Sequence, residues 1–402
     1  MDKCPPEIHA RIFSYACTDD GTTGCHLSLV SRYIHQVSSP YRWQCLALAG
    51  FKHVAQFADV LEGVKQKRPI YHLFLSDRRP YVIDTQTNFD HFMEYDTKFV
   101  PAMMQILRLA GPTLQTLSLF SEACFVDGAM AVKHCLSIPY PQLKELTLRA
   151  CCTPSQLTGT FRGDTIPCNT PELTLLHLAL PYHGFSSDNL QATHNLVQSI
   201  SPNVEQLRFT MLDKWGNRRV VEVIHSELAD SGIVSDVLDL PPSDWDSPRI
   251  ATAHPVTWDR LLPENLKLFA IQPSPTSTFY CSCCMDLRGD VDVMRILERM
   301  SDLADKERFL YMDRRPIRVR KCRTDPLEVA GYGHQEARSD WMERIDEGNG
   351  CWKQRDDLDC DANSQDGRTQ LRSPPAFLLV PKRKKMRRVT RLKNMFKKLK
   401  VW

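Results

Sequence analysis

The chain has 402 residues, of which 42% are hydrophobic and 25% charged, so it is long enough to bury a sizeable core. Its formal net charge of +3 is unevenly distributed: the last 36 residues hold 13 of the 51 Lys and Arg residues and no acid, which leaves 38 bases against 48 acids before them. We therefore expect an acidic body with a net charge of −10 and a strongly basic tail.

The sequence does not favour a secreted or membrane protein. It begins without an apolar stretch, and its apolar runs are too short to cross a bilayer. The 15 cysteines are odd in number and scattered along the chain. We expect them to be reduced thiols in the cytoplasm or the nucleus.

Two short helices are predicted near the N-terminus. Paired prolines suit the start of a helix over 5–15, with Ile8, Ile12 and Phe13 on one face. The Gly- and Thr-rich segment 18–24 predicts a turn. An apolar stripe over 29–37 then predicts a second helix, which Pro40 ends, and a new element begins at Trp43.

A pattern of the form Leu-x-x-Leu-x-Leu recurs along the central part of the chain, with a proline two residues before the first position in four copies. The first positions lie at 114, 143, 173 and 204, and the next clear copy, at 266, follows after twice the preceding interval. A degraded copy, Ser235/Leu238/Leu240, lies halfway along that doubled interval. The clear copies are Ile70/Leu73/Leu75, Leu114/Leu117/Leu119, Leu143/Leu146/Leu148, Leu173/Leu176/Leu178, Val204/Leu207/Phe209 and Leu266/Phe269/Ile271.

A period of about 30 residues with this apolar pattern is typical of a leucine-rich-repeat-like solenoid. Each copy would form a short strand whose leucines point into a shared core, and helices or loops such as 191–200 and 217–231 would connect the strands. Other α/β proteins also space their strands at about 30 residues, but this alternative does not explain the repeated proline. The predicted fold class is therefore an α/β repeat, made irregular by long connections around 76–110 and 241–262.

The segment after Ile271 no longer follows the repeat. Hydrophobic spacing predicts a helix over 290–303, a closing strand over 308–312 and a short helix over 340–345. Residues 353–375 are polar and poor in apolar residues, which predicts a disordered linker over 353–381. The expected domains are a small all-helical module at 1–48, the solenoid at 49–315, a closing segment at 316–352, the linker at 353–381 and a basic amphipathic tail at 382–402.

The sequence contains no recognisable catalytic or cofactor motif. It lacks a Gly-x-Ser-x-Gly elbow, a phosphate-binding glycine loop and a His-Glu-x-x-His zinc motif. Cys281, Cys283 and Cys284 form a dense thiol cluster, but a zinc site needs four ligands and no second pair has the usual spacing. We interpret this cluster as reduced loop cysteines and His177 as structural. The expectation is a protein without enzymatic activity, cofactor or bound metal.

Residues 4–48 resemble an F-box. That motif begins with Leu-Pro, an acidic residue and an aliphatic helix ending in Ile-Phe-Ser-Tyr, continues with Leu-x-x-Val-Ser/Cys-Arg and closes on Trp-x-x-Leu. This chain departs from it by having Cys4 in place of leucine and an additional Pro6. Together with the leucine-rich pattern, the segment resembles F-box-like proteins of basidiomycete fungi. The matching residues are Pro5, Glu7, Ile8, Ile12-Phe13-Ser14-Tyr15, Leu27, Leu29-Val30-Ser31-Arg32, Trp43 and Leu46.

The resemblance implies a role in protein recognition. F-box helices dock on a Skp-type adaptor of a cullin ubiquitin ligase complex, and the repeats bind a protein substrate that other subunits modify. The alternative is that the helices only cap the solenoid of a ligase-independent scaffold, because repeat arrays need such caps for solubility. The residues that the resemblance assigns to the adaptor are Pro5, Glu7, Ile8, Ile12, Phe13, Leu29 and Val30.

The basic tail has two parts. A short cluster of cations resembles a nuclear import signal that an import receptor would bind. Residues 389–402 then carry an apolar residue every three to four positions on an otherwise cationic helix. Such a helix suits an anionic membrane surface, an acidic groove or nucleic acid phosphates. The remaining alternatives are a solvated tail without a partner and a tail that folds against the acidic body. The cations of the import candidate are Lys382, Arg383, Lys384, Lys385, Arg387 and Arg388.

Overall fold

The structure is a computed structural model that describes residues 4–64, 69–77, 95–124, 126–151, 157, 169–179, 187–212, 217–235, 262–273, 287–312 and 334–352. The chain divides into two compact units, Met1–Trp352 and Lys353–Trp402, and every element described below belongs to the first. The expected linker at 353–381, the basic tail at 382–402 and the cysteines at 281, 283 and 284 lie outside the described residues.

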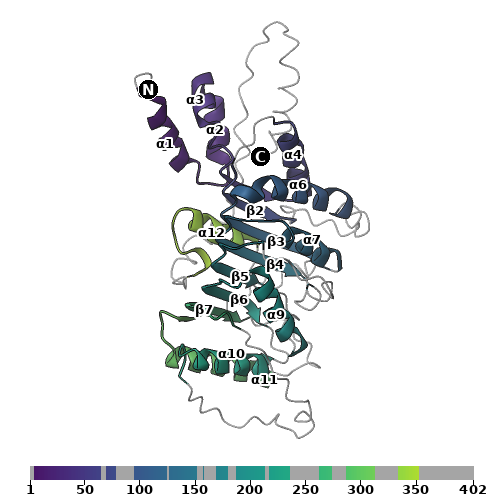
Figure 1. The fold of residues 1–402 in the computed structure, drawn as a ribbon, viewed down its shortest axis with the longest axis vertical. Helices are drawn as coiled ribbons and strands as arrows, with labels where there is room; N and C mark the ends of the chain where they lie inside the picture. The colour runs from purple at the N-terminus through teal and green to yellow at the C-terminus, as the bar shows by residue number, and fades with distance from the viewer. Residues whose placement is uncertain are drawn as a thin grey trace. The chain divides into compact units, whose positions relative to one another are not determined.

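The described strands form one eight-stranded parallel sheet, in which the order of the strands is their order in the sequence (Figure 1). Parallel neighbours need a long crossover between them, and helices provide it here. The strands are β1 (Cys45–Ala49), β2 (His72–Ser76), β3 (Thr116–Cys124), β4 (Glu145–Cys151), β5 (Leu175–Ala179), β6 (Gln206–Leu212), β7 (Leu268–Pro273) and β8 (Phe309–Tyr311).

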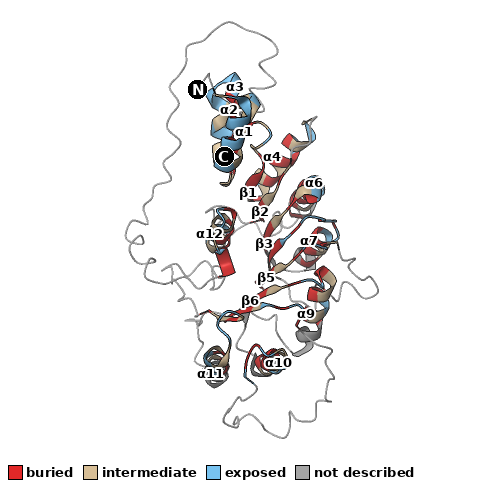
Figure 2. Ribbon diagram, turned by 60° about the vertical axis from the view of Figure 1, so that its left-hand side comes forward, coloured by how far each residue is buried: buried red, intermediate tan, exposed pale blue. Residues whose placement is uncertain are grey.

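The helices between the strands contribute to one hydrophobic core with the sheet. Figure 2 shows α4, α6, α7 and α9 on the same side of the strands. A π-helical turn, η1 (Tyr95–Phe99), and a 3-10 turn, η2 (Gly111–Thr113), flank α6. The connecting helices are α4 (Phe51–Glu62), α6 (Val100–Ala110), α7 (Val126–Leu136), α9 (Ser187–Ile200), α10 (Asn217–Asp230) and α11 (Leu287–Leu303).

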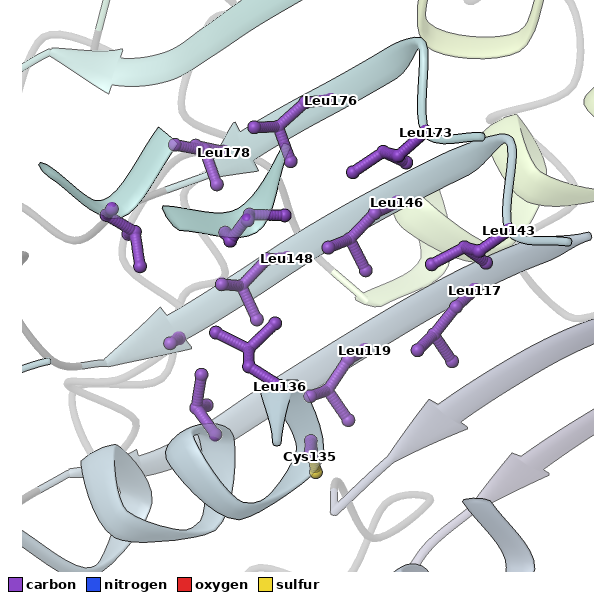
Figure 3. Packing of buried hydrophobic residues seen from close by; sticks show 14 of the residues in the cluster. Leu117, Leu119, Cys135, Leu136, Leu143, Leu146, Leu148, Leu173, Leu176 and Leu178 are labelled. Atoms are coloured by element: carbon purple, nitrogen blue, oxygen red, sulfur yellow. The ribbon is translucent and has the colours of Figure 1, made fainter. Parts of the chain in front are cut away.

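The repeated leucines form the sheet's side of this core. Leu117, Leu146, Leu176 and Leu207 are register partners across β3 to β6, and all four are buried in the same cluster. Figure 3 shows Leu119, Leu148 and Leu178 forming a second row beside them. The expectation that equivalent positions of the pattern share one continuous core is therefore confirmed.

The predicted fold class, an all-helical F-box-like module followed by an irregular leucine-rich-repeat-like solenoid, is wrong. The chain forms a single eight-stranded parallel sheet alternating with helices, which is an α/β fold. Its first strand, β1, begins at Cys45, within the segment assigned to the helical module. A short strand, a crossover helix and two connections together require about 30 residues. The period in the sequence therefore measures the strand–helix unit of an α/β sheet.

Several predicted elements are found close to their expected positions. The helix expected at 290–303 is α11, and the closing strand is β8. The connections at 191–200 and 217–231, expected to be helices or loops, are the helices α9 and α10. The degraded copy at 235–240 does not add a strand to the sheet between β6 and β7, because these two pair directly. Ser235 lies outside the strands, and residues 236–240 lie outside the described part of the chain.

The opposite face of the sheet carries a second, smaller core. The helix α12 (His334–Ile345) packs there against β2 and β3, and the 3-10 turn η3 (Gly350–Trp352) follows it. Figure 2 shows α12 on the other side of the strands from α4, α6 and α7. The residues of this second core are Cys45, Phe74, Phe120, Ala179, Ala337, Trp341 and Ile345.

We predict that Leu146→Ala lowers the free energy of unfolding by about 2–5 kcal/mol, because it leaves a cavity at the centre of a closely packed core. Denaturation by urea, followed by circular dichroism, measures the change. Leu109→Ala is the matched control, since Leu109 is exposed on α6, and we expect it to change stability by no more than about 0.5 kcal/mol. Equal effects of the two substitutions would contradict the assignment of Leu146 to the core.

Candidate protein-interaction surface

Three short helices precede the sheet and expose large hydrophobic side chains. They are α1 (Pro6–Ala16), α2 (Thr22–Val30) and α3 (Arg32–Ser38), and Figure 2 shows most of their surface as exposed. Seven large hydrophobic residues are exposed in the described part of the chain, and Leu109 is the only one of them outside α1–α3. The other six, here called the apolar surface, are Ile8, Ile12, Tyr15, Leu29, Val30 and Tyr33.

Apolar groups that face solvent together, rather than singly, are typical of an interaction site. Ile8 and Ile12 lie one turn apart on α1 and are 47% and 52% exposed. Leu29 and Val30 close α2 and are 66% and 68% exposed. Helical spacing explains why Ile8 and Ile12 share a face, since residues four apart are neighbours on a helix surface.

Six of the seven residues that the resemblance assigned to an adaptor are exposed. Pro5 precedes α1, and Glu7 lies in its first turn beside Ile8. Phe13 is the exception, because its side chain is buried. Tyr15 and Tyr33 belong to the apolar surface but were not assigned to the adaptor. The sequence feature that could have assigned Tyr15 to this surface is its position three residues after Ile12 on the same helix.

Phe13 is buried because α1 turns its other face toward α3. Its ring stacks on the buried His9, one turn earlier, with the ring centroids 6.0 Å apart. His9 Nδ1 is hydrogen-bonded to the Tyr33 hydroxyl at 2.8 Å, and Ile34 on α3 is also buried. The three helices therefore have a small interior of their own, and the isoleucines of α1 do not contribute to it.

The break between α2 and α3 has a local cause. Sequence analysis predicted one helix over 29–37, but the chain ends α2 at Val30 and starts α3 at Arg32. Ser31 between them is extended, and its hydroxyl accepts a hydrogen bond from the Ile34 N–H at 3.1 Å. A serine at this position satisfies a helix N-terminus, so the sequence favours a new start here.

The N-terminal helices are anchored to the first edge of the sheet. The Gln44 side-chain amide donates hydrogen bonds to the carbonyl oxygens of Ser14 and Cys17, the latter at 3.0 Å. The Gln44 carbonyl accepts from the Tyr71 and His72 N–H groups, which ties the same residue to the start of β2. The Ala47 N–H of β1 donates to the Asp20 carbonyl at 3.3 Å. These contacts orient the helices while leaving the apolar surface outside.

The turn before α2 is shaped by its own residues. The Asp19 carboxylate accepts hydrogen bonds from the Gly21 and Thr23 N–H groups. Gly21 has a φ of 95°, which side-chain-bearing residues rarely adopt. A Cβ on Gly24 would lie 2.8 Å from the backbone of Arg42. The glycines predicted as a turn therefore permit close packing against the segment that leads into β1.

Two thiols in this region, those of Cys17 and Cys45, are buried. Burial raises the pKa of the Cys17 thiol to about 11, and it raises the pKa of Cys45 further. Both remain protonated near neutral pH, and a protonated thiol is neither a nucleophile nor a metal ligand. Within the described ranges, no group of three His, Cys, Asp or Glu residues is arranged to hold a metal ion. None of the described helices is long and apolar enough to span a membrane.

No family model, no curated protein and no solved structure matches this chain.

Proposed function

We propose that this protein is a non-enzymatic recognition subunit of a cullin-type ubiquitin ligase. In this proposal the helices α1–α3 dock on a Skp-type adaptor, and the body that contains the sheet binds a protein substrate. Catalysis belongs to other subunits of the complex.

The observation that carries the proposal is the apolar surface of α1–α3. Its residues Ile8, Ile12, Leu29 and Val30 are those that the F-box resemblance assigns to the adaptor, and they are exposed. A helical module that only capped the sheet would turn such residues inward. Here the contacts to the sheet come instead from Gln44 and from the turn before α2, so anchoring does not use the apolar surface.

The energetics are compatible with docking. Full burial of an isoleucine side chain contributes about 1.5–3 kcal/mol, so covering the exposed half of Ile8 or of Ile12 contributes about 1 kcal/mol each. Six such side chains on neighbouring helices supply enough apolar area for the centre of an interface, where truncation of one residue commonly costs more than about 1 kcal/mol.

The alternative function is a ligase-independent interaction scaffold. It is favoured by the anchoring contacts, because the turn between α1 and α2 bonds to the edge strand β1 through the Ala47–Asp20 hydrogen bond. An exposed edge strand can pair with strands of other chains. Protecting that edge would be a sufficient role for the N-terminal helices without an adaptor. The two functions differ in whether the apolar surface binds an adaptor.

We predict that the double substitution Ile8→Asp and Ile12→Asp weakens binding to a purified Skp-type adaptor by at least about a hundredfold. The change removes apolar contact area and places two charges in the interface without partners. Isothermal titration calorimetry with the full chain measures the affinity. We expect the melting temperature to change little, because both side chains point away from the interior of the helices.

The matched control is Leu109→Asp, which places a negative charge on the large exposed hydrophobic residue that lies outside α1–α3 in the described part of the chain. We expect this variant to bind the adaptor like the wild type. Unchanged binding by the double variant would rule out docking through α1. Unfolding of the double variant would instead favour the scaffold, in which these residues serve the fold.

We also propose that the cationic cluster at 382–388 directs nuclear import. The support is its sequence, six cations among seven residues with no acid nearby. We predict that replacing Lys382, Arg383, Lys384 and Lys385 with alanine moves a fluorescently tagged protein from the nucleus to the cytoplasm, as seen by microscopy.

The control for the tail is the pair Leu392→Ala and Phe396→Ala, which removes apolar residues and keeps every charge. If an import receptor recognises the cations, this double variant should remain in the nucleus. If the pair disturbs location as much as the lysine changes do, the tail acts as an amphipathic binder of an anionic surface or acidic groove. A deletion of 382–402 that leaves location unchanged would mean that the tail has no role in import.

A further inference from the structure

The two faces of the sheet differ in chemistry. The face toward α4, α6 and α7 is lined by leucines, whereas the opposite face carries buried charged and polar side chains beside the few apolar residues of the second core, such as Phe74 and Phe120. In a parallel sheet with permanent layers on both faces, the strands are normally hydrophobic almost throughout. Buried polar groups at fixed positions are instead typical of a surface that orients a ligand. On this face they include Glu145, Thr147, His177, Arg208, Thr210 and Gln272.

The chain's own segment 334–352, here called the strap, lies on this polar face. Trp341 is its apolar anchor, because it is buried against Phe74 of β2 with the ring centroids 5.9 Å apart. Ala337 and Ile345 lie one turn before and after Trp341 and belong to the same small core. The strap therefore presents a narrow apolar stripe with one large aromatic residue at its centre.

Glu145 of β4 receives donors from the last turn of α12 and from η3. Arg344 Nε lies 2.7 Å from one carboxylate oxygen, and Trp352 Nε1 donates to the other at 3.1 Å. The carboxylate is almost fully buried, and a buried carboxylate is stable only when its oxygens are paired. Glu145 therefore selects a cation and an N–H donor in a defined arrangement.

Arg208 of β6 recognises the backbone of the strap. Its guanidinium donates to the carbonyl oxygen of Cys351 and, at 2.7 Å, to the Gln272 side-chain oxygen. Its Nε donates to the Thr210 hydroxyl at 3.1 Å, so neighbouring strands hold the arginine in place. Because Arg208 contacts a main-chain carbonyl oxygen, it would accept any ligand side chain at that position. Glu145 and Phe74 contact side chains, so they would select the sequence of the ligand.

A tight turn brings η3 close to the last turn of α12. Gly348 and Gly350 lie between Arg344 and Trp352, and a Cβ on Gly350 would lie 2.7 Å from the carbonyl oxygen of Asp340. Gly350 has a φ of 53°, and Glu347 also has a positive φ. The sequence of this turn therefore permits the approach that lets Arg344 and Trp352 share one carboxylate.

The strap is not part of the strand–helix alternation that builds the sheet. It begins at His334, whereas the last described strand of the sheet, β8, ends at Tyr311. Its displacement would leave every strand pairing and the larger core intact, since Ala337, Trp341 and Ile345 belong to the second core alone. Contacts of this polar character resemble exchangeable interfaces more than a domain core.

We propose that the polar face of the sheet is a binding site for a helical protein segment that carries an aromatic residue followed three positions later by arginine. The strap is the intramolecular copy of this ligand, with Trp341 and Arg344 as its aromatic residue and arginine. A protein partner with the same pattern displaces the strap, and this pattern defines the class of substrate. The inference concerns the substrate side of the proposed function, but it does not depend on adaptor binding.

The test uses the full chain and, as probe, a fluorescent synthetic peptide of residues 334–352. The variant Trp341→Ala with Arg344→Ala weakens the strap's hold in its own chain. We expect this variant to bind the peptide at least about tenfold more tightly than the wild type, whose site is occupied. Adding Glu145→Arg to the strap variant should abolish its tighter binding of the peptide. A peptide that carries Arg344→Glu should then bind to this triple variant.

The matched control is Lys267→Glu, which reverses a charge in the exposed ion pair between Lys267 and Glu205. We expect its peptide affinity to equal that of the wild type. Equal peptide binding by the strap variant and the wild type, or no binding by either, would overturn the proposal.

Hydrogen exchange on the wild-type full chain decides the matter if the strap variant does not fold. A displaceable strap opens locally, so the amides of α12 should exchange at least about tenfold faster than those of β3, β4 and β5. If the amides of α12 are protected from exchange as strongly as those of these strands, α12 is a permanent layer of the fold. That result would overturn the proposal. Adaptor titration of the same variants is a separate measurement, so failure of adaptor docking and failure of strap displacement can be told apart.

Discussion

Register across the parallel sheet is the constraint on which the rest of this structure depends. Each strand places an apolar residue beside that of its neighbour, from Leu73 through Leu117 and Leu146 onward. A slip of one residue in any pairing would turn these side chains to the other face of the sheet. The leucines would then meet Glu145 and Thr147, the neighbours of Leu146 in β4, on the side where charge and hydroxyl groups belong.

The same register places polar groups together on the opposite face. Because side chains alternate along a strand, a pattern that directs leucines to one side directs Glu145, His177 and Arg208 to the other. Such groups are costly to bury unless they are paired. The strap pairs Glu145 with Arg344 and Arg208 with a backbone carbonyl, so the chemistry of this face and the chemistry of the strap are complementary.

The N-terminal helices and the strap meet at the first edge of the sheet. Arg338 of α12 forms an ion pair with Asp20, in the turn that also bonds to β1. This ion pair is partly exposed and contributes little to stability by itself. It nevertheless links the segment that covers the polar face to the module that carries the apolar surface. The two proposed binding events, to an adaptor and to a substrate, thus involve neighbouring parts of one unit.

Local patterns in the sequence contained a large part of this structure. Hydrophobic spacing located α11, and the leucine pattern identified the buried row of β3 to β6. The helical repeat placed Ile8, Ile12 and Phe13 on one face, which holds for Ile8 and Ile12 but not for the buried Phe13. These predictions succeed because the period of a helix or strand depends on residues within a few positions of each other. The fold class was not predictable in this way, because a period of about 30 residues suits both a solenoid and an α/β sheet.

What the sequence by itself determined is therefore the elements and the apolar side of each. Only the tertiary structure decided which surface each side chain meets. Phe13 shares a helix with Ile12 but is buried on His9. Trp341 reaches Phe74, and Arg344 reaches Glu145, although each pair lies far apart in the sequence. No local period records such contacts, because they form only after the parallel register has brought distant segments onto one face of the sheet.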